Sequence, residues 1–485
     1  MKSSYIMKKE KTKNIYFVGI KGVGMTMLAQ FLVKQGNIVS GSDIAETFLT
    51  DKVLSNAGIK VFVGFNPDNI PNDADLIIYS SAYNEKNNPE LGYIENNRES
   101  FKAELMCYAE ALGKVFNNYK GISVCGSHGK TTTTAWLGYV LDKAGKSPNV
   151  LVGSRVPQFK GSTLMGDSKL FVAETDEYQN KLKYFQPHGV VLNNIEYDHP
   201  DFFKNEASYL KVFRDFVKKI PDSGFLVINN GDKKLRKISQ SLNTNVISYD
   251  LARNNREPKS ESVINYLAYN IEQKGFNQSF MVNNLGRFEI KLAGDYNVRN
   301  ALAVIAACRE LKVPITKIKK YLGTFKGTER RMQKLGLYNQ AQFIDDYAHH
   351  PTEVIASLSA LRKAYKNRNI ITVFHPHTYT RTKELFSEFS KSFDDTNELI
   401  VLDIYGSARE KQGGTSSAKL VSAINRNYKK EIVNKERKKA VNIKTISEVA
   451  KYLKQNAKKG DVVVLMGAGD VFRVWDLLKT KASKK

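Results

Sequence analysis

The chain has 485 residues, 42% of them hydrophobic and 25% charged, which is ordinary for a folded globular protein and predicts two to four domains. Its formal net charge is +25, but the lysines are spread along the sequence and form no basic patch with interleaved aromatics. We therefore expect anionic small molecules, and not nucleic acid, as partners. No apolar run approaches the roughly 18 residues that a membrane-spanning helix needs, so we expect no membrane partner.

The basic first residues, "MKSSYIMKKEKTKN", lack the apolar segment of a secretory signal, and we expect them to form a short disordered tail. Three cysteines without paired spacing fit a reducing compartment better than a disulfide framework or a zinc site. Together these features predict a cytoplasmic protein.

The first patterned segment is "IYFVGIKGVGMTMLAQFLVKQGNIVSGSD". An apolar run, a glycine-rich turn, a helical period and a second apolar run predict a strand, turn, helix and strand in that order. Gly19, Gly22 and Gly24 would let backbone amides approach a pyrophosphate at a helix N-terminus, and Asp43 falls where a ribose-binding acid is expected. The other interpretation is an ordinary tight turn between a strand and a helix.

A second turn, "GSHGKTTTT", follows the predicted strand "ISVC" and precedes a helix that we expect to run from about Thr131 to Gly145. A strand, a loop with Gly126, Gly129 and Lys130, and a helix give the context of a phosphate-binding loop. Its spacing is shorter than the common G-x-x-x-x-G-K-[ST] form. Lys130 would contact the β- and γ-phosphates of a nucleotide, and the hydroxyl of Thr131 or Thr132 would reach Mg²⁺.

Two further predicted strands end in acidic clusters, "ETDE" with Glu174 and "NNIEYDH" with His199. Carboxylates suit Mg²⁺, and an imidazole beside them suits a second cation. Because ligands bind at the carboxyl ends of parallel strands, these clusters predict a metal site near the phosphate loop. Acids that only cap helices are the other interpretation.

The last third of the chain contains the polar clusters "TERRM", "DDYAHHPTE" and "HPHTYTRT", each at the end of a predicted strand or at a junction. Arg330 and Arg331 are placed to reach a transferring phosphate when domains close. Arg381 is suited to hold a carboxylate through two hydrogen bonds. Six of the seven histidines lie in the polar clusters of the chain, which favours a functional role for them as a group.

These blocks, in this order and over nearly the whole chain, resemble the Mur ligase family. The motifs on which this resemblance rests are "GIKGVGM", "GSHGKTTT", "ETDE", "NNIEYDH", "GDYNVRNALA", "FKGTERRM", "DDYAHHPTE", "HPHTYTRT", "YGSARE" and "MGAGD". The resemblance implies an α/β protein of three domains. These are a Rossmann-like UDP-sugar domain at 1–116, a P-loop-type ATP domain at 117–327 with a mainly parallel sheet and a small β portion, and a Rossmann-like amino-acid domain at 328–485.

The resemblance also implies an activity. An ATP-dependent ligase would join L-alanine to the lactoyl carboxylate of UDP-N-acetylmuramate through an acyl phosphate, in peptidoglycan precursor synthesis, as a monomer or homodimer. Its cofactors would be ATP and Mg²⁺, with two ions in the site.

The site residues that the resemblance implies fall into five groups. The catalytic group is Lys130, Glu174, His199, Arg330, Arg331 and His349. The ATP group is Gly126, Ser127, His128, Gly129, Lys130, Thr131, Thr132, Asn297, Asn300, Arg330 and Asp346. The UDP-sugar group is Gly19, Gly22, Gly24, Met25, Ser42, Asp43 and Ser81. The amino-acid group is His349, His377 and Arg381. The metal ligands are Thr131, Glu174 and His199.

Several positions depart from the family pattern. Lys21 stands in place of a glycine, Tyr296 in place of a histidine and Thr378 in place of an arginine. Tyr178, in "ETDEYQNKL", is closer to ligases of the family that attach a murein tripeptide to the same UDP-sugar, so that acceptor stays an alternative. A nicotinamide-dependent oxidoreductase and a non-catalytic nucleotide- or RNA-binding protein are more distant alternatives, because they leave the second loop, the acidic strand ends and the arginine pair unexplained.

Overall fold

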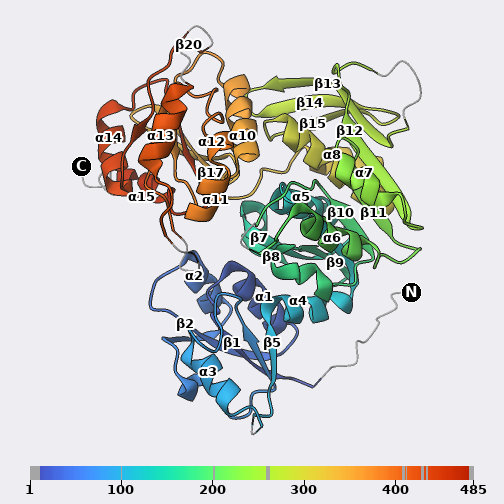
Figure 1. Ribbon diagram of the computed structural model, residues 1–485. Coiled ribbons are helices and arrows are strands. Elements are labelled where there is room, and N and C mark those ends of the chain that lie inside the picture. The colour runs from blue at the N-terminus through green and yellow to red at the C-terminus, as the bar shows by residue number, and fades with distance from the viewer. Residues whose placement is uncertain are drawn as a thin grey trace.

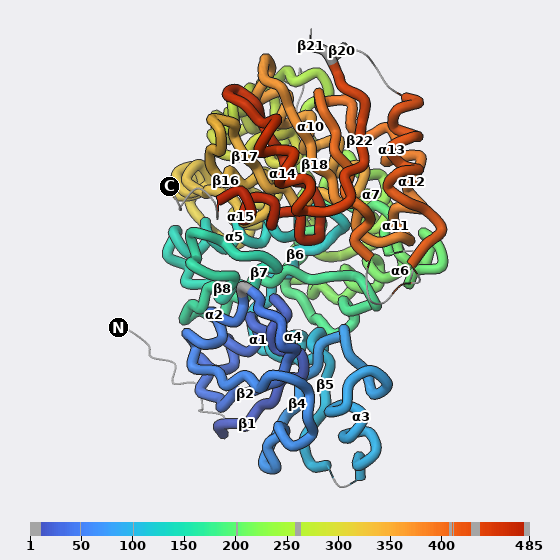
Figure 2. Tube along the Cα trace, turned by 90° about the vertical axis from the view of Figure 1, so that its left-hand side faces the viewer, coloured from blue at the N-terminus to red at the C-terminus, as the bar shows by residue number. Residues whose placement is uncertain are grey.

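The protein folds around three β-sheets that follow one another along the chain (Figures 1 and 2). This computed structural model describes residues 11–99, 101–199, 202–257, 263–406, 410, 412–427, 431–432 and 435–479. The structure describes the expected disordered tail, residues 1–14, only from Lys11 on, and its last residue, Asn14, lies in a strand. Part of the "YGSARE" motif lies outside the described residues.

The N-terminal sheet has five parallel strands in the order β3-β2-β1-β4-β5. The strands are β1 (Asn14–Val18), β2 (Ile38–Asp43), β3 (Lys60–Val63), β4 (Leu76–Tyr79) and β5 (Glu104–Cys107). The helices are α1 (Val23–Lys34), α2 (Leu49–Asn56), α3 (Pro89–Asn96) and α4 (Tyr108–Asn117), with the short helix η1 (Pro67–Asn69). The predicted strand-turn-helix-strand unit at the start of the chain is confirmed.

The central sheet has ten strands in the order β15-β14-β13-β12-β11-β10-β6-β9-β7-β8. Its strands are β6 (Lys120–Cys125), β7 (Asn149–Val156), β8 (Gly161–Leu164), β9 (Leu170–Glu174), β10 (Gly189–Leu192), β11 (Phe225–Asn229), β12 (Asn245–Leu251), β13 (Tyr266–Lys274), β14 (Asn277–Val282) and β15 (Gly286–Ile290). The helices are α5 (Lys130–Lys143), α6 (Glu206–Val217), α7 (Lys233–Ser239), α8 (Asp295–Glu310) and α9 (Ile315–Leu322), with η2 (Pro157–Phe159) and η3 (Tyr178–Tyr184).

The expected small β portion is the antiparallel run β13-β14-β15, and it is continuous with the large sheet. β13 pairs in parallel with β12, so the two parts share one hydrogen-bonded ladder. The strands that carry the predicted phosphate loop and acidic clusters, β6, β9 and β10, are parallel neighbours in the middle of the sheet. Their carboxyl ends therefore meet at one edge.

The C-terminal sheet has the order β16-β17-β23-β18-β19-β22, and β16 is its one antiparallel strand. Its strands are β16 (Gln333–Tyr338), β17 (Ala341–Asp346), β18 (Ile370–Phe374), β19 (Glu398–Val401), β22 (Val441–Asn442) and β23 (Val462–Met466), beside the small pair β20 (Glu431–Ile432) and β21 (Lys435–Glu436). The helices are α10 (Pro351–Ala364), α11 (Tyr379–Glu384), α12 (Phe386–Phe389), α13 (Ser417–Arg426), α14 (Ile446–Asn456) and α15 (Arg473–Lys479).

The three sheets confirm the predicted α/β class with three domains. The domain boundaries at 116/117 and 327/328 stay predictions. In the part of the chain that the structure describes, no helix is both long enough and apolar enough to cross a bilayer.

The helix that follows the phosphate loop, α5, is buried along most of its length and anchors the central core. Trp136 is fully buried, and its indole N–H donates a hydrogen bond of 3.1 Å to the carbonyl of Leu322. Its ring stacks on Phe325 at a centroid distance of 5.3 Å. This contact fixes α5 against the segment that leads into the C-terminal domain.

We expect Trp136→Ala to destabilise the central domain by about 3–5 kcal/mol, because it leaves a cavity and removes the bond to Leu322. Calorimetric melting measures the loss as a lower transition temperature. Trp136→Phe keeps most of the buried area and loses only the indole hydrogen bond, so its shift should be clearly smaller. Equal shifts for the two variants would contradict this account of the packing.

Candidate active site between the central and C-terminal domains

The phosphate loop lies between β6 and α5, as the sequence predicts. Gly126 and Gly129 have φ angles of 118° and 81°, which side chains with a Cβ rarely adopt. A Cβ at Gly126 would also lie 2.6 Å from the carbonyl oxygen of Asn194. Because Gly129 is the N-cap of α5, the loop presents free backbone amides at a helix N-terminus, an arrangement that binds anions.

Lys130 points back over the loop that it follows. Its ammonium donates hydrogen bonds of 2.6 Å and 3.2 Å to the carbonyls of Gly126 and Ser127, and lies 3.6 Å from Glu177 Oε2. Burial disfavours the charged amine, but the nearby carboxylates of Glu177, Asp176 and Glu174 outweigh it and raise the pKa of Lys130. The lysine is therefore a fixed positive charge beside the loop.

Two of the three predicted metal ligands are in contact. Thr131 Oγ1 donates a 2.7 Å hydrogen bond to Glu174 Oε1, and Glu174 Oε2 accepts from the amide of Gly153 at 2.7 Å. The third, His199, has a left-handed φ of 58°, and its ring centroid lies 4.6 Å from that of Tyr178. A hydroxyl and a carboxylate at the loop are the hard oxygen donors that Mg²⁺ prefers, so this pair fits a magnesium ion.

A cavity of about 390 Å³ opens on the other side of the loop, between the central and C-terminal domains. That volume is within the range of small-molecule sites. Of the predicted ATP-binding residues, those that line it are His128, Gly129, Thr132, Asn297, Asn300 and Asp346. Those that do not are Gly126, Ser127, Lys130, Thr131 and Arg330.

Three polar atoms that belong to cavity-lining residues are buried without a hydrogen-bond partner among the described residues: Asp346 Oδ2, Asn193 Oδ1 and Thr328 Oγ1. Buried polar atoms are normally paired, so such orphans beside a cavity mark groups that a ligand can satisfy. Burial raises the pKa of Asp346 to about 6. On the opposite wall, the side chains of Asn297 and Asn300 are hydrogen-bonded to each other at 3.2 Å. These groups fit the hydroxyls and base of a nucleotide.

The two neighbouring arginines have different surroundings. Arg330 has a left-handed φ of 59° and donates to the carbonyls of Gly467 and Gly469 at 2.7 Å and 2.8 Å. It therefore holds the loop after β23. Arg331 lines the cavity, and its Nη1 lies 3.8 Å from Glu353 Oε1. Of the pair, Arg331 is the one that faces the cavity.

An imidazole from the phosphate loop joins the two domains. His128 Nε2 lies 2.9 Å from Glu196 Oε2, and His128 Nδ1 lies 3.0 Å from Glu353 Oε1 on α10. Burial disfavours the imidazolium, but Glu353 and Glu196 outweigh it and raise the pKa of His128 to about 9. His128 is therefore a cation at neutral pH, held between one carboxylate from each domain.

The predicted amino-acid residues lie together near this junction. Arg381 Nη2 lies 3.2 Å and 3.4 Å from the two carboxylate oxygens of Asp198, while Arg381 Nε and His377 Nδ1 are buried without a hydrogen-bond partner among the described residues. Burial lowers the pKa of His349 to about 3 and that of His377 to about 4, so both imidazoles are neutral at pH 7. Thr378 caps α11 with a φ of 67° and accepts from the Arg381 amide.

The predicted UDP-sugar residues belong to the N-terminal domain. Asp43 accepts from the amides of Lys21 at 2.6 Å and Ile44 at 2.8 Å, so the acid ties down the glycine-rich turn. The Lys21 ammonium is buried, donates to two carbonyls of the next loop and lies 3.0 Å from Asp51. In that turn, a Cβ on Gly24 would clash with Tyr108, while Gly22 has room.

The other predicted UDP-sugar residues have mixed environments. Ser42 donates a 2.5 Å hydrogen bond to buried Glu90, Met25 packs in the core, and Ser81 is exposed. None of the UDP-sugar set lines the interdomain cavity.

Three family models match the chain in sequence order. They are the Mur ligase family catalytic domain at residues 14–128, the Mur ligase middle domain at 124–308 and the Mur ligase glutamate ligase domain at 330–469. UDP-N-acetylmuramate–L-alanine ligase of Acetivibrio thermocellus is 36% identical over 487 residues, with 99% of each chain covered. The enzyme of that name from Clostridium acetobutylicum is also 36% identical and covers 99% of this chain and 100% of its own.

The chain belongs to the Mur ligase family. Its fold resembles the solved UDP-N-acetylmuramate–alanine ligase of Thermotoga maritima, with a TM-score of 0.79, 24% identity and coverage of 97% of this chain and 100% of that one. It also resembles the murein peptide ligase of Psychrobacter arcticus, with a TM-score of 0.70, 22% identity and coverage of 98% and 99%. Both confirm the three-domain fold of this Mur ligase.

Sequence reasoning found the loop of this Mur ligase but missed the partners that hold it. Glu353 and His350 lie in the "HHPTE" segment and Glu177 lies in "ETDE", yet the sequence pattern assigns none of the three a role. A usable signal was present for Glu353. It lies four residues after His349, a spacing that places both on one face of a helix start, and they contact each other at 3.2 Å.

We expect the imidazole of His128 to titrate near pH 9, and Glu353→Gln to lower that pKa, because the variant removes one of two facing carboxylates. Histidine NMR titration measures it, with His128→Gln to assign the signal and His188 as an internal reference. Since the pKa is raised on folding, its stabilisation is complete below about pH 6.5 and is lost as pH rises toward about 9. A pKa of His128 near 6.5 would contradict the double ion pair.

Proposed function

We propose that this Mur ligase is an ATP-dependent UDP-N-acetylmuramate–L-alanine ligase of peptidoglycan precursor synthesis. The observation that carries the proposal is the cavity of about 390 Å³ in which phosphate-loop residues face Arg331 and Asp346 of the C-terminal domain. The predicted amino-acid residues do not line this cavity, but His349 contacts its lining residue Glu353 at 3.2 Å. The two full-length relatives that are 36% identical carry this activity in their names.

The first step joins two anions. A lactoyl carboxylate oxygen attacks the γ-phosphorus of ATP, the bond to the β-phosphate bridge oxygen breaks, and ADP leaves with the released electron pair. Lys130, the amides at the α5 N-terminus and Arg331 offset the repulsion between the carboxylate and the phosphate. Mg²⁺, held by Glu174 and Thr131, would neutralise phosphate charge when bound.

In the second step the amine of L-alanine attacks the acyl carbon, and inorganic phosphate leaves from the tetrahedral intermediate. The ammonium group of L-alanine loses a proton to solvent before its nitrogen attacks, and the neutral imidazole of His349 would accept a hydrogen bond from the resulting amine. The buried Nε of Arg381 has no hydrogen-bond partner within the described ranges and could bind the amino-acid carboxylate beside the contact with Asp198. His377 would contact the same carboxylate.

The remaining assignments are part of this proposal. The glycine-rich turn with Gly19, Gly22 and Gly24 would hold the uridine diphosphate, together with Met25, Ser42, Asp43 and Ser81. His199 would hold a second Mg²⁺. The protein would act in the cytoplasm, as a monomer or homodimer, and support cell-wall growth, cell shape and division.

A tripeptide acceptor is the second candidate, because Tyr178 departs from the alanine-ligase pattern and packs on His199 at 4.6 Å. A phosphate-release screen separates the two. The protein is mixed with UDP-N-acetylmuramate, ATP and Mg²⁺, and L-alanine, L-serine, glycine and the murein tripeptide are compared. We expect the highest kcat/KM with L-alanine; a clear preference for the tripeptide would overturn the proposed acceptor, and no release with any acceptor would overturn the ligase.

We expect Lys130→Ala to lower kcat by at least about 100-fold, since the developing phosphate charge loses a fixed partner in a buried site. Steady-state phosphate release measures the effect. Lys143→Ala is the matched control, because it lies on the same helix with an exposed side chain and should leave kcat unchanged. Near-normal turnover of Lys130→Ala would contradict its assignment to the phosphate.

We expect Arg381→Ala to raise the KM for L-alanine by about 10- to 100-fold, the cost of losing one charge-assisted pair, with a much smaller change in the KM for ATP. Arg381→Lys should recover part of the loss. Arg287→Ala, an exposed arginine far along the central sheet, serves as the control. Equal effects on both KM values would argue against a carboxylate-binding role.

A further inference from the structure

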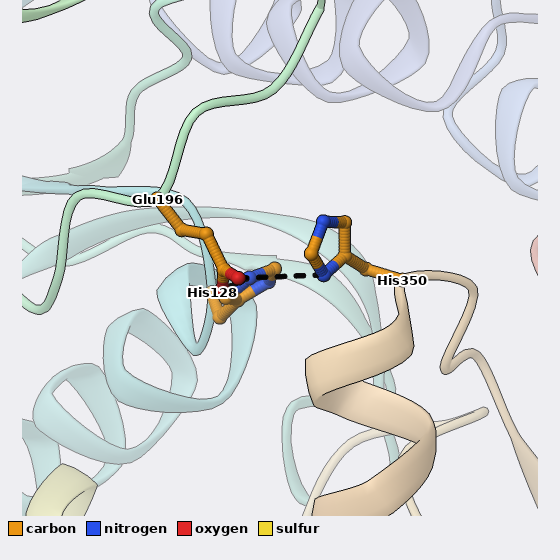
Figure 3. Close-up of side chains that lie close together, drawn as sticks. All are labelled: His128, Glu196 and His350. Atoms are coloured by element: carbon orange, nitrogen blue, oxygen red, sulfur yellow. Dashed lines mark hydrogen bonds and ion pairs between the residues drawn. The ribbon is translucent and has the colours of Figure 1, made fainter. Parts of the chain in front are cut away.

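Two histidines and a glutamate converge at the boundary between the phosphate loop and α10 (Figure 3). His128 lies in the phosphate loop, Glu196 follows β10, and His350 is the N-cap of α10. The first two therefore belong to the central domain and the third to the C-terminal domain. None of them is a predicted magnesium ligand.

Their donor atoms have the spacing of a metal-ligand set. One ligand atom from each residue lies within 4.8 Å of the other two. His128 Nε2 is 2.9 Å from Glu196 Oε2, and His350 Nδ1 is 3.9 Å from Glu196 Oε1. Ligand atoms around tetrahedral Zn²⁺ lie about 3.3 Å apart, so an ion requires side-chain shifts on the order of 1 Å. Among the described residues this is the one such group of three or more His, Cys, Asp or Glu side chains.

Outer contacts orient these donors. Glu353 Oε1 lies 3.0 Å from His128 Nδ1, and a carboxylate on the far nitrogen of an imidazole directs the near nitrogen, Nε2, toward a metal. Thr352 Oγ1 donates a 2.7 Å hydrogen bond to Glu196 Oε1 and fixes the carboxylate. Arg331 lies 3.8 Å from Glu353 and balances its charge. These three outer residues therefore hold the ligand atoms in the orientation that a metal ion requires.

We propose that His128, Glu196 and His350 form a site for a transition-type divalent cation such as Zn²⁺, which bridges the central and C-terminal domains. Two imidazoles and one carboxylate favour Zn²⁺ over Mg²⁺, which prefers oxygen ligands. On binding, the metal takes the Nε2 lone pair of His128, and the proton on that nitrogen goes to solvent. It also takes the Nδ1 lone pair of His350, which releases the 3.3 Å hydrogen bond from the Thr352 amide. Water fills the fourth position. The ion then ties the phosphate loop to α10 and holds the domains together.

Calorimetric titration of the full-length protein with Zn²⁺, in excess Mg²⁺ and without nucleotide, tests the site. We expect one saturable site that is lost in His350→Gln and Glu196→Gln, and weakened about 10- to 100-fold in Glu353→Gln, as for other outer-layer partners of a ligating histidine. His188→Gln, the one histidine outside the polar clusters, is the matched control and should bind as the unaltered protein does. The measurement requires no turnover, so its outcome is separate from that of the proposed ligase activity.

Co²⁺ provides a second measurement that needs no variant to fold. A four-coordinate site with two imidazoles gives intense visible absorption bands, and added Zn²⁺ should abolish them. Equal Zn²⁺ affinity in all variants, or a Co²⁺ spectrum no stronger than that of the hydrated ion, would overturn the proposal.

Discussion

The contact of one imidazole with two carboxylates fixes how the domains meet. The ring nitrogens of His128 contact a carboxylate oxygen of Glu196, in its own domain, at 2.9 Å and one of Glu353, in the C-terminal domain, at 3.0 Å. Because the loop that carries His128 also carries Lys130 and Thr131, the same contact positions the phosphate site against α10. Glu353 also lies 3.8 Å from Arg331 and 3.2 Å from His349, so one carboxylate contacts His128, the cavity arginine and a histidine of the predicted amino-acid group.

The electrostatics of the junction fit a reaction between anions. Positive groups, among them Lys130, Arg331 and the N-terminus of α5, surround the loop, while buried carboxylates hold them in place. The environments of three histidines at the junction give them two different protonation states. His128 lies between carboxylates and is protonated at neutral pH, whereas burial lowers the pKa of His349 and His377 and keeps them neutral. One fold thus supplies a fixed cation and two neutral imidazoles within a single junction.

Local patterns allowed the sequence to predict much of this. Strand-loop-helix order placed the phosphate loop, and the acidic ends of two neighbouring parallel strands placed Glu174 beside Thr131. Glu353, one of the two carboxylates that contact His128, is 225 residues away along the chain, so no local pattern indicates this contact. Arg330 turns away from the cavity because its left-handed backbone directs it to the loop after β23, a conformation that sequence alone does not indicate. Lys21 replaces a family glycine and still fits, because the loop after β2 supplies two carbonyls and helix α2 supplies Asp51 for its ammonium.

The central claim is that this chain activates a carboxylate with ATP at the junction of two domains. Isotope transfer tests it most directly. UDP-N-acetylmuramate labelled with ¹⁸O in both oxygens of its lactoyl carboxylate is converted with ATP and L-alanine, and the released phosphate is analysed by mass spectrometry. The account predicts one ¹⁸O atom in each phosphate, because the acyl oxygen leaves with phosphorus. Phosphate without the label would contradict it.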